Sequence, residues 1–156
     1  MKLEKKLKEL VLKLPEVSTP GGNYVSVNVR GNIAYVAIQF PIVNGNYHYQ
    51  GRLGDKISTE DGYKAMEMCA LNVIAQIEAK VGFENVIGLN HIDAYFLASN
   101  EWDDSPKIVN GASDIFVNVL GEKGTHSRAI FGVDSLPRNF SVGLTATVTL
   151  KSTIGL

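Results

Sequence analysis

The stretch Ser141-Val-Gly-Leu-Thr-Ala-Thr-Val-Thr-Leu150, near the end of the chain, decides the fold. Its residues alternate in type, so one face of a β-strand here carries only aliphatic side chains, those of Val142, Leu144, Ala146, Val148 and Leu150. Serine, glycine and threonine make up the other face. Since only the aliphatic face suits a core, we expect a sheet that is covered by helices on one side.

Outward from this strand, the sequence indicates three helices and five further strands. The helices are predicted over residues 2–14, 58–82 and 105–121, and the strands over 24–29, 33–40, 47–50, 92–97, 127–133 and 141–150. Asp61 stands in capping-box register with Ser58, and Ser105 is followed by Pro106, which is typical of helix starts. The first three strands form an antiparallel meander, with Gly31-Asn32 as the first turn.

This order predicts one α+β domain over residues 1–156, in which a mixed sheet carries both main helices on one face. The helix at 2–14 is an addition to that domain. Its leucines at positions 3, 7, 10 and 14 have helical spacing, and Pro15 ends it. Glu4 and Glu9 stand among its lysines, which favours packing on the protein body over a membrane surface.

The net charge, the hydropathy, and the cysteine and histidine residues argue against several classes of protein. The net charge is −1, so nucleic acid is an unlikely partner, and no stretch is apolar and long enough to span a membrane. Cys69, the lone cysteine, has alanines and valine at helical spacing, which favours a buried structural thiol and a cytoplasmic location. The three histidines are widely spaced, and no phosphate-binding loop or nucleophile motif occurs. We therefore expect no metal and no cofactor.

The second face of the sheet needs a cover that the chain itself does not supply. A closed symmetric oligomer is the simplest way to provide one.

Four stretches carry a family resemblance, and they are Gly22-Asn-Tyr-Val25, Val36-Ala-Ile-Gln-Phe-Pro41, Val109-Asn-Gly-Ala-Ser113, and Ser127-Arg-Ala129 through Leu136-Pro137. In this order they resemble the RidA/YjgF family, the imine deaminase and "endoribonuclease L-PSP" group. The extra N-terminal helix is similar to a longer branch of that family. The resemblance implies a chorismate-mutase-like homotrimer, in which the sheets form an inner barrel and ligand clefts lie between subunits.

The resemblance also implies a binding site for a small carboxylate. Arg128 corresponds to the arginine that holds the carboxylate of a 2-imino acid or enamine in a bidentate pair, a geometry that suits a guanidinium. Tyr24 corresponds to an aromatic wall of the cleft, and Asn110 to an asparagine that shapes it. Gln39 keeps a family position and orders the backbone of its strand.

Three positions depart from the family pattern. Gly143 stands where deaminating members carry a glutamate that assists the attacking water, so we assign no catalytic acid or base. Ile38 replaces a glycine whose backbone approaches the ligand, and it is expected to reshape the pocket. Ile130 stands where many members have a cysteine. His126, two residues before Arg128, is a candidate replacement for the missing acid.

These residues leave several hypotheses open. The first is an imine or enamine deaminase that works without the family glutamate. The second is a non-catalytic, trimeric carboxylate-binding or regulatory protein, which Gly143 and Ile38 favour. An endoribonuclease is the third, and the near-neutral charge counts against it. A chorismate mutase would rest on fold analogy alone, because only one arginine is placed for a substrate with two carboxylates.

Overall fold

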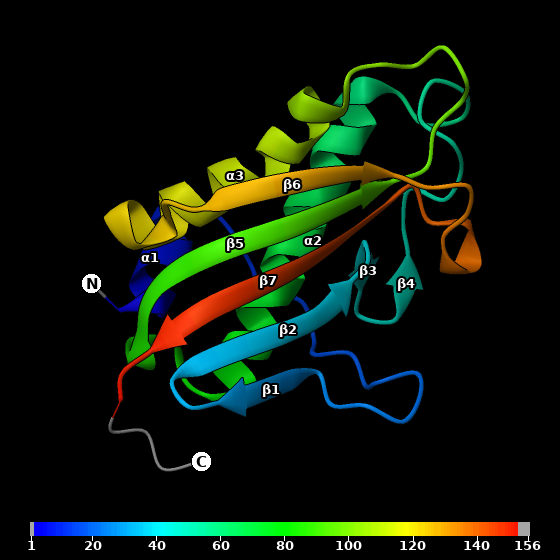
Figure 1. The fold of residues 1–156 in the computed structure, drawn as a ribbon. Coiled ribbons are helices and arrows are strands. Elements are labelled where there is room, and N and C mark those ends of the chain that lie inside the picture. Colours follow the sequence, from blue (N-terminus) through cyan, green and yellow to red (C-terminus); the bar gives the residue numbers. More distant parts are fainter. Residues whose placement is uncertain (1, 153–156) are drawn as a thin grey trace.

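A sheet and two long helices form two layers in the computed structural model, which describes residues 2–152 (Figure 1). The helices are α1 (Leu3–Glu9), α2 (Thr59–Lys80) and α3 (Ser105–Leu120). The strands are β1 (Val27–Arg30), β2 (Ile33–Gln39), β3 (Ile42–Val43), β4 (Asn46–Tyr47), β5 (Val86–Phe96), β6 (Ser127–Gly132) and β7 (Val142–Leu150). Short 3-10 turns lie at Phe83–Asn85, Gly121–Gly124 and Pro137–Asn139.

The main sheet is mixed. Its five strands run in the order β1-β2-β7-β5-β6, and only the pair β5 and β6, which α3 connects, is parallel. Both α2 and α3 lie behind the sheet in the view of Figure 1. The predicted α+β class, with two main helices on one face of a mixed sheet and a further helix at the N-terminus, is confirmed.

The two long helices begin close to where the sequence predicts. Ser58 caps α2, because its hydroxyl accepts a hydrogen bond from the backbone N–H of Asp61 at 3.1 Å. The cap of α3 is Asp104, one residue earlier than expected, and its carbonyl accepts the first helical bond from Lys107 at 3.0 Å. Pro106 lies in the first turn, where its missing N–H has no helical partner to lose.

The N-terminal helix is shorter than the prediction of 2–14. It ends at Glu9 because the N–H of Leu12 bonds back to the carbonyl of Leu7 at 2.8 Å and that of Val11 bonds to Lys8 at 3.1 Å. This is a Schellman termination, and it places Val11 in the left-handed region at φ 56°. A β-branched residue is rare there, so the sequence contains no signal for this end.

Two strands also differ from expectation. The predicted third strand at 47–50 does not join the meander, since β4 pairs only with β3, and Tyr49 at φ 53° turns the chain away. Strand β5 begins at Val86, six residues before the predicted start, because register shifts between Val86 and Gly88 and between Leu89 and His91 accommodate residues that are typical of turns.

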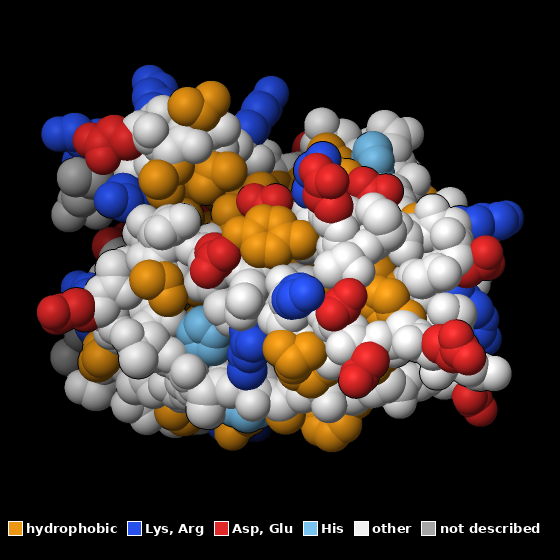
Figure 2. All heavy atoms as spheres, turned by 90° about the horizontal axis from the view of Figure 1, so that it is seen from above, with side chains coloured by type: hydrophobic (Ala, Val, Ile, Leu, Met, Phe, Trp, Pro, Cys, Tyr) orange, Lys and Arg blue, Asp and Glu red, His pale blue; other side chains and the backbone are white. Residues whose placement is uncertain are grey.

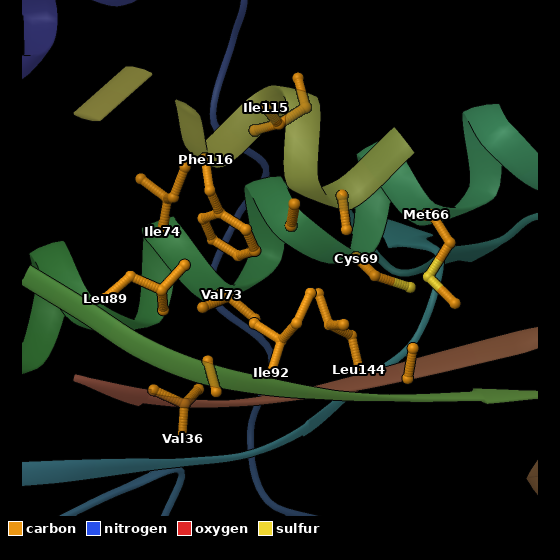
Figure 3. Close-up of a cluster of buried hydrophobic side chains, with 14 of the residues drawn as sticks. Val36, Met66, Cys69, Val73, Ile74, Leu89, Ile92, Ile115, Phe116 and Leu144 are labelled. Atoms are coloured by element: carbon orange, nitrogen blue, oxygen red, sulfur yellow. The ribbon is translucent and has the colours of Figure 1, made fainter. Parts of the chain in front are cut away.

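The core lies between the sheet and the helix pair (Figure 3). Ile92 and Leu144 point from the sheet toward Phe116 of α3 and Val73 of α2, and all four are almost fully buried. The aliphatic face of β7 enters this core, as the alternation predicts, with every one of its five side chains at most 3% exposed. Its threonines lie on the opposite face and are partly exposed.

Among residues 2–152, no helix lies on the other face of the sheet (Figure 1). Tyr35 of β2 is 51% exposed and Phe131 of β6 is 45% exposed. Phe131 stacks on Tyr95 with ring centroids 5.4 Å apart. Aromatic side chains on an open sheet face agree with the expected need for a cover.

Helices α2 and α3 approach each other closely at Gly111. A Cβ built on Gly111 would lie 2.1 Å from the carbonyl oxygen of Tyr63 and 3.2 Å from the Cβ of Met66. Because the obstacle is backbone, neither helix can yield by a rotamer change. Glycine at this position therefore sets the distance between the helices.

We predict that Gly111→Ala destabilises the protein by about 1–3 kcal/mol or more, although alanine is the better helix former. The clash forces α3 away from α2. Unfolding by urea, at one protein concentration, measures the loss. Gly21→Ala is the matched control, because a Cβ at Gly21 has no atom within 4 Å. Equal stability of both variants would show that the helices separate without cost.

Candidate functional site: an arginine held by a helix

Arg128 extends from β6 toward α3. It pairs in register with Ile92, whose side chain enters the core, and both therefore lie on the helix side of the sheet. Its Nη1 donates to Asn110 Oδ1 at 2.8 Å and to Ser113 Oγ at 3.1 Å, and its Nη2 donates to the carbonyl of Pro106 at 3.3 Å. Three acceptors from successive turns of α3 thus hold one guanidinium.

All three acceptors are neutral. The ion pairs between side chains of residues 2–152 are Lys64–Glu60, His91–Asp93 and Lys107–Asp104, and Arg128 belongs to none of them. Of its five N–H donors, the three bonds to α3 use three. The Nε–H and one Nη2–H have no acceptor among the described residues, and a guanidinium can offer such donors to a carboxylate in two parallel hydrogen bonds.

Ser113 also makes a polar contact with His126. Ser113 Oγ is 2.9 Å from Nε2 of His126, and Nδ1 of the same ring contacts the carbonyl of Gly124. Both ring nitrogens therefore have protein partners. His126 does not face the guanidinium directly, so its predicted role as a replacement acid has no direct geometric support.

Ile130 lies on the same side of β6 as Arg128, two residues further along. It is partly buried and packs against the hydrophobic core. It is thus placed as an apolar neighbour of the arginine on β6.

Ile38 and Gly143 meet on the opposite face of the sheet. A Cβ on Gly143 would lie 2.8 Å from Cδ1 of Ile38 and 3.0 Å from Cε1 of Phe40. The two departures from the family pattern are therefore one local change, because the side chain of Ile38 fills the space into which a side chain at position 143 would extend.

Gln39 and Tyr24 have other surroundings. Gln39 is buried, and its Nε2 donates to the carbonyl of Ala37 at 3.0 Å, which agrees with a role in ordering its own strand. Tyr24 precedes β1, is 51% exposed, and its hydroxyl accepts from the N–H of Gly21 at 3.1 Å. Strand β1 and strand β6 are opposite edges of the sheet, so Tyr24 is remote from Arg128 within one chain.

The structure thus brings Arg128 and Asn110 together and places Ile130 beside them, but it puts Gly143, Ile38 and Tyr24 elsewhere. Ser113 was not predicted as a site residue. The signal for it is its spacing of three from Asn110, which puts both on one face of a helix. His126 stands two residues before Arg128 and directly precedes β6.

Shifted pKa values occur on α2, outside this cluster. A hydrogen bond to Asp114, together with burial, raises the pKa of Tyr63 to about 12. Burial and the charge of Asp114 raise the pKa of Glu67. Burial also raises the pKa of Cys69, so this thiol stays protonated and is structural, as predicted.

Comparison with known proteins supplies the family. Residues 4–148 match the model of the family described as YjgF/chorismate mutase-like, putative endoribonuclease. Protein TCP17 of Trypanosoma cruzi is 32% identical over 148 residues, which are 94% of this chain and 92% of the relative.

Two solved structures are similar throughout. A putative endoribonuclease from Shewanella oneidensis MR-1 has a TM-score of 0.93 and 30% identity, with 96% of this chain and 100% of that chain covered. Protein Atu1372 of unknown function from Agrobacterium tumefaciens has a TM-score of 0.88 and 32% identity, with 96% of this chain and 92% of that chain covered.

Within residues 2–152, the structure contains no helix with the length and hydropathy needed to cross a bilayer.

We predict that Gly143→Ala costs about 1 kcal/mol of stability, because the new methyl group displaces the Ile38 side chain. The cost should be smaller in an Ile38→Ala background, where that space is open. A double-mutant cycle from urea unfolding at constant protein concentration measures the coupling between the two positions. Additive effects would mean that the two side chains do not compete for the same volume.

Proposed function

The chain belongs to the YjgF/chorismate-mutase-like family, and on this premise we propose that it binds a small carboxylate at Arg128 and hydrolyses 2-imino acids or enamines to 2-keto acids and ammonia. The observation that carries the proposal is the state of Arg128. A permanent cation is held on three neutral acceptors and keeps one pair of donors for a ligand.

The three neutral acceptors of Arg128 favour a carboxylate as the ligand for an electrostatic reason. An arginine that is paired with a carboxylate of its own chain has its charge compensated, and a ligand must compete with that partner. At Arg128 the ligand would supply the first negative charge in contact with the guanidinium. Hydrogen bonds between charged groups contribute about 1.5–3 kcal/mol, which is enough to orient a small ligand.

The surroundings suit a small anion better than a polyanion. Figure 2 shows the face that carries β6 and α3, and basic and acidic side chains are interspersed over it, without a continuous basic stripe. Together with the net charge of −1, this supports a single carboxylate over a nucleic-acid backbone.

The chemistry would proceed by addition and elimination. An enamine would first isomerise to the imine by moving its N–H proton to carbon. A water then adds to the imine carbon and one of its protons goes to the nitrogen, which gives a carbinolamine. The hydroxyl proton of this adduct moves to the amino nitrogen as the carbon–nitrogen bond breaks, and the products are the 2-keto acid and ammonia. Arg128 would hold the carboxylate next to this carbon. Because position 143 is a glycine, we propose that an ordered water attacks without a carboxylate at that position.

The proposed site needs a second chain. Arg128 on the β6 side and Tyr24 before β1 lie toward opposite edges of the sheet, so a ring of copies would bring the two edges of neighbouring chains together. We propose a homotrimer in which Tyr24 of one chain completes the cleft at Arg128 of the next, and in which the open sheet face with Tyr35 lines the inner barrel.

A second function is favoured by one observation. Ile38 lies against Gly143, so a glutamate at position 143 would require the Ile38 side chain to move. A site that retains Arg128, and in which Ile38 lies against the position of the family glutamate, also suits a non-catalytic, carboxylate-binding protein.

We predict that the protein accelerates release of ammonia from freshly generated 2-iminopropanoate and that Arg128→Ala lowers kcat/KM by about 10- to 100-fold. Arg128→Lys should recover only part of the loss, because lysine cannot form the bidentate pair. Arg30→Ala, which removes an exposed arginine on β1, is the matched control.

The outcomes separate the two functions. No acceleration by the unmodified protein, with activity in the double variant Ile38→Gly/Gly143→Glu, would identify a binding protein whose catalytic group has been lost. The double variant is required because glutamate alone at position 143 would meet Ile38. Activity that Arg128→Ala leaves unchanged would contradict the site.

We predict a trimer mass by light scattering at micromolar concentration. Tyr35→Glu should shift the mass toward the monomer, since it places three charges in the proposed barrel. Tyr47→Glu is the control, because Tyr47 is similarly exposed, at 48% against 51%, but belongs to the separate β3–β4 hairpin. A monomeric mass for the unmodified protein would overturn both the assembly and the shared cleft.

A further inference from the structure

Ser113 lies between two groups that constrain the direction of its hydrogen bonds. Its hydroxyl oxygen is 3.1 Å from Nη1 of Arg128 and 2.9 Å from Nε2 of His126. A guanidinium has only donors, so Ser113 must accept from Arg128. Its single hydroxyl proton is then available for His126.

The other side of the histidine ring determines where its proton lies. Nδ1 faces the carbonyl oxygen of Gly124, which can only accept, so Nδ1 carries a proton. In a neutral ring, Nε2 is then the acceptor and receives the hydroxyl proton of Ser113. A doubly protonated ring would instead direct a second donor at Ser113 and place a second positive charge near Arg128.

The ring is also fixed in place. It packs edge-on against Phe116 with ring centroids 6.0 Å apart. Gly124 sits close to α3, since a Cβ on it would lie 2.3 Å from the carbonyl oxygen of Phe116. The acceptor for Nδ1 is therefore held at a constant position relative to the helix that carries Ser113.

We propose that His126 is a positioning residue of the carboxylate site and acts through Ser113. By taking the hydroxyl proton, it commits the oxygen of Ser113 to Arg128. A serine hydroxyl without this partner rotates freely, and in some of its rotamers the proton points at the guanidinium. We call the chain of hydrogen bonds from His126 through Ser113 to Arg128 the relay. When the relay is intact, three acceptors hold the guanidinium so that the Nε–H edge stays open to the ligand.

This proposal rests on the proposed function for the identity of the ligand, but not for the hydrogen-bond relay. The two parts are therefore tested separately, first on the ligand-free protein and then with a carboxylate probe.

In the ligand-free protein, long-range ¹H–¹⁵N NMR correlations of the histidine ring report which nitrogen is protonated. We expect the Nδ1–H tautomer for His126. Rotation of the Arg128 guanidinium, followed by exchange broadening of its Nη protons, should be slow and should become faster in Ser113→Ala and in His126→Phe. An Nε2–H tautomer, or rotation that neither variant changes, would overturn the relay.

The binding experiment uses 2-oxobutanoate, a stable product analogue, and calorimetry on the intact protein. We expect His126→Phe and Ser113→Ala each to weaken the affinity by about 5- to 10-fold, the effect of one hydrogen bond. The double variant should be no weaker than Ser113→Ala alone, because His126 acts only through that hydroxyl. Ser113→Thr, which keeps the hydroxyl, should retain most of the affinity.

The outcomes are distinguishable. Additive losses in the double variant would show that His126 contacts the ligand or stabilises the fold independently, and they would overturn the positioning role. Unchanged affinity in both single variants would do the same. If the unmodified protein binds no 2-oxobutanoate while the tautomer and slow rotation are as expected, the proposed function fails and the relay remains as a support for Arg128.

Discussion

The close approach of α3 to α2 at Gly111 is the contact on which the candidate site depends. Gly111 follows Asn110 directly and stands two residues before Ser113, so the separation that it permits also sets the position of both acceptors. Any side chain at Gly111 would push α3 away from the carbonyl of Tyr63, and the acceptors would move with it. The geometry at Arg128 is thus a consequence of helix packing in the core, since the same turn of α3 supplies the packing contact and the polar contact.

The one-sided sheet determines which candidate residues can cooperate. Side chains of a strand alternate between faces, so Arg128 and Ile130 point toward α3, whereas Phe131 points to the open face. Ile38 and Gly143 meet on that open face. In one chain, Arg128 and Gly143, the position of the family glutamate, are therefore separated by the sheet. Any cleft that uses both, or that includes Tyr24, must lie between chains, which is why the proposed function includes a trimer.

The strong periodic signals were sufficient for the sheet and for the long helices, because the alternation of β7 and the apolar stripes of α2 and α3 reflect burial directly. The local deviations from regular helix and strand geometry could not be predicted from the sequence. Val11 adopts a left-handed conformation that its side chain disfavours, and β5 continues through Gly88 and Asn90 by shifts in register. Within the site, the resemblance implies that Arg128 and Asn110 belong to one cleft, and the structure adds the hydrogen bond between them. The coupling of Ile38 with Gly143, and the contacts of Ser113 with both His126 and Arg128, join separate elements of the chain, and only the packed chain brings them together.

The acid next to Ser113 shows how the charge of Arg128 is kept available. Asp114 follows Ser113 directly, but the next position on a helix is rotated by about 100°. Its carboxylate therefore bonds to Tyr63 of α2 and raises the pKa of that phenol to about 12. The negative charge is thus directed to the outside of the helix pair, while the neutral side chains of Asn110 and Ser113 face the arginine. If the order of Ser113 and Asp114 were reversed, the acid would stand on the face toward β6 and would compensate the guanidinium from within the chain. The order of two neighbouring residues on α3 therefore distinguishes a self-paired arginine from one that is open to a ligand.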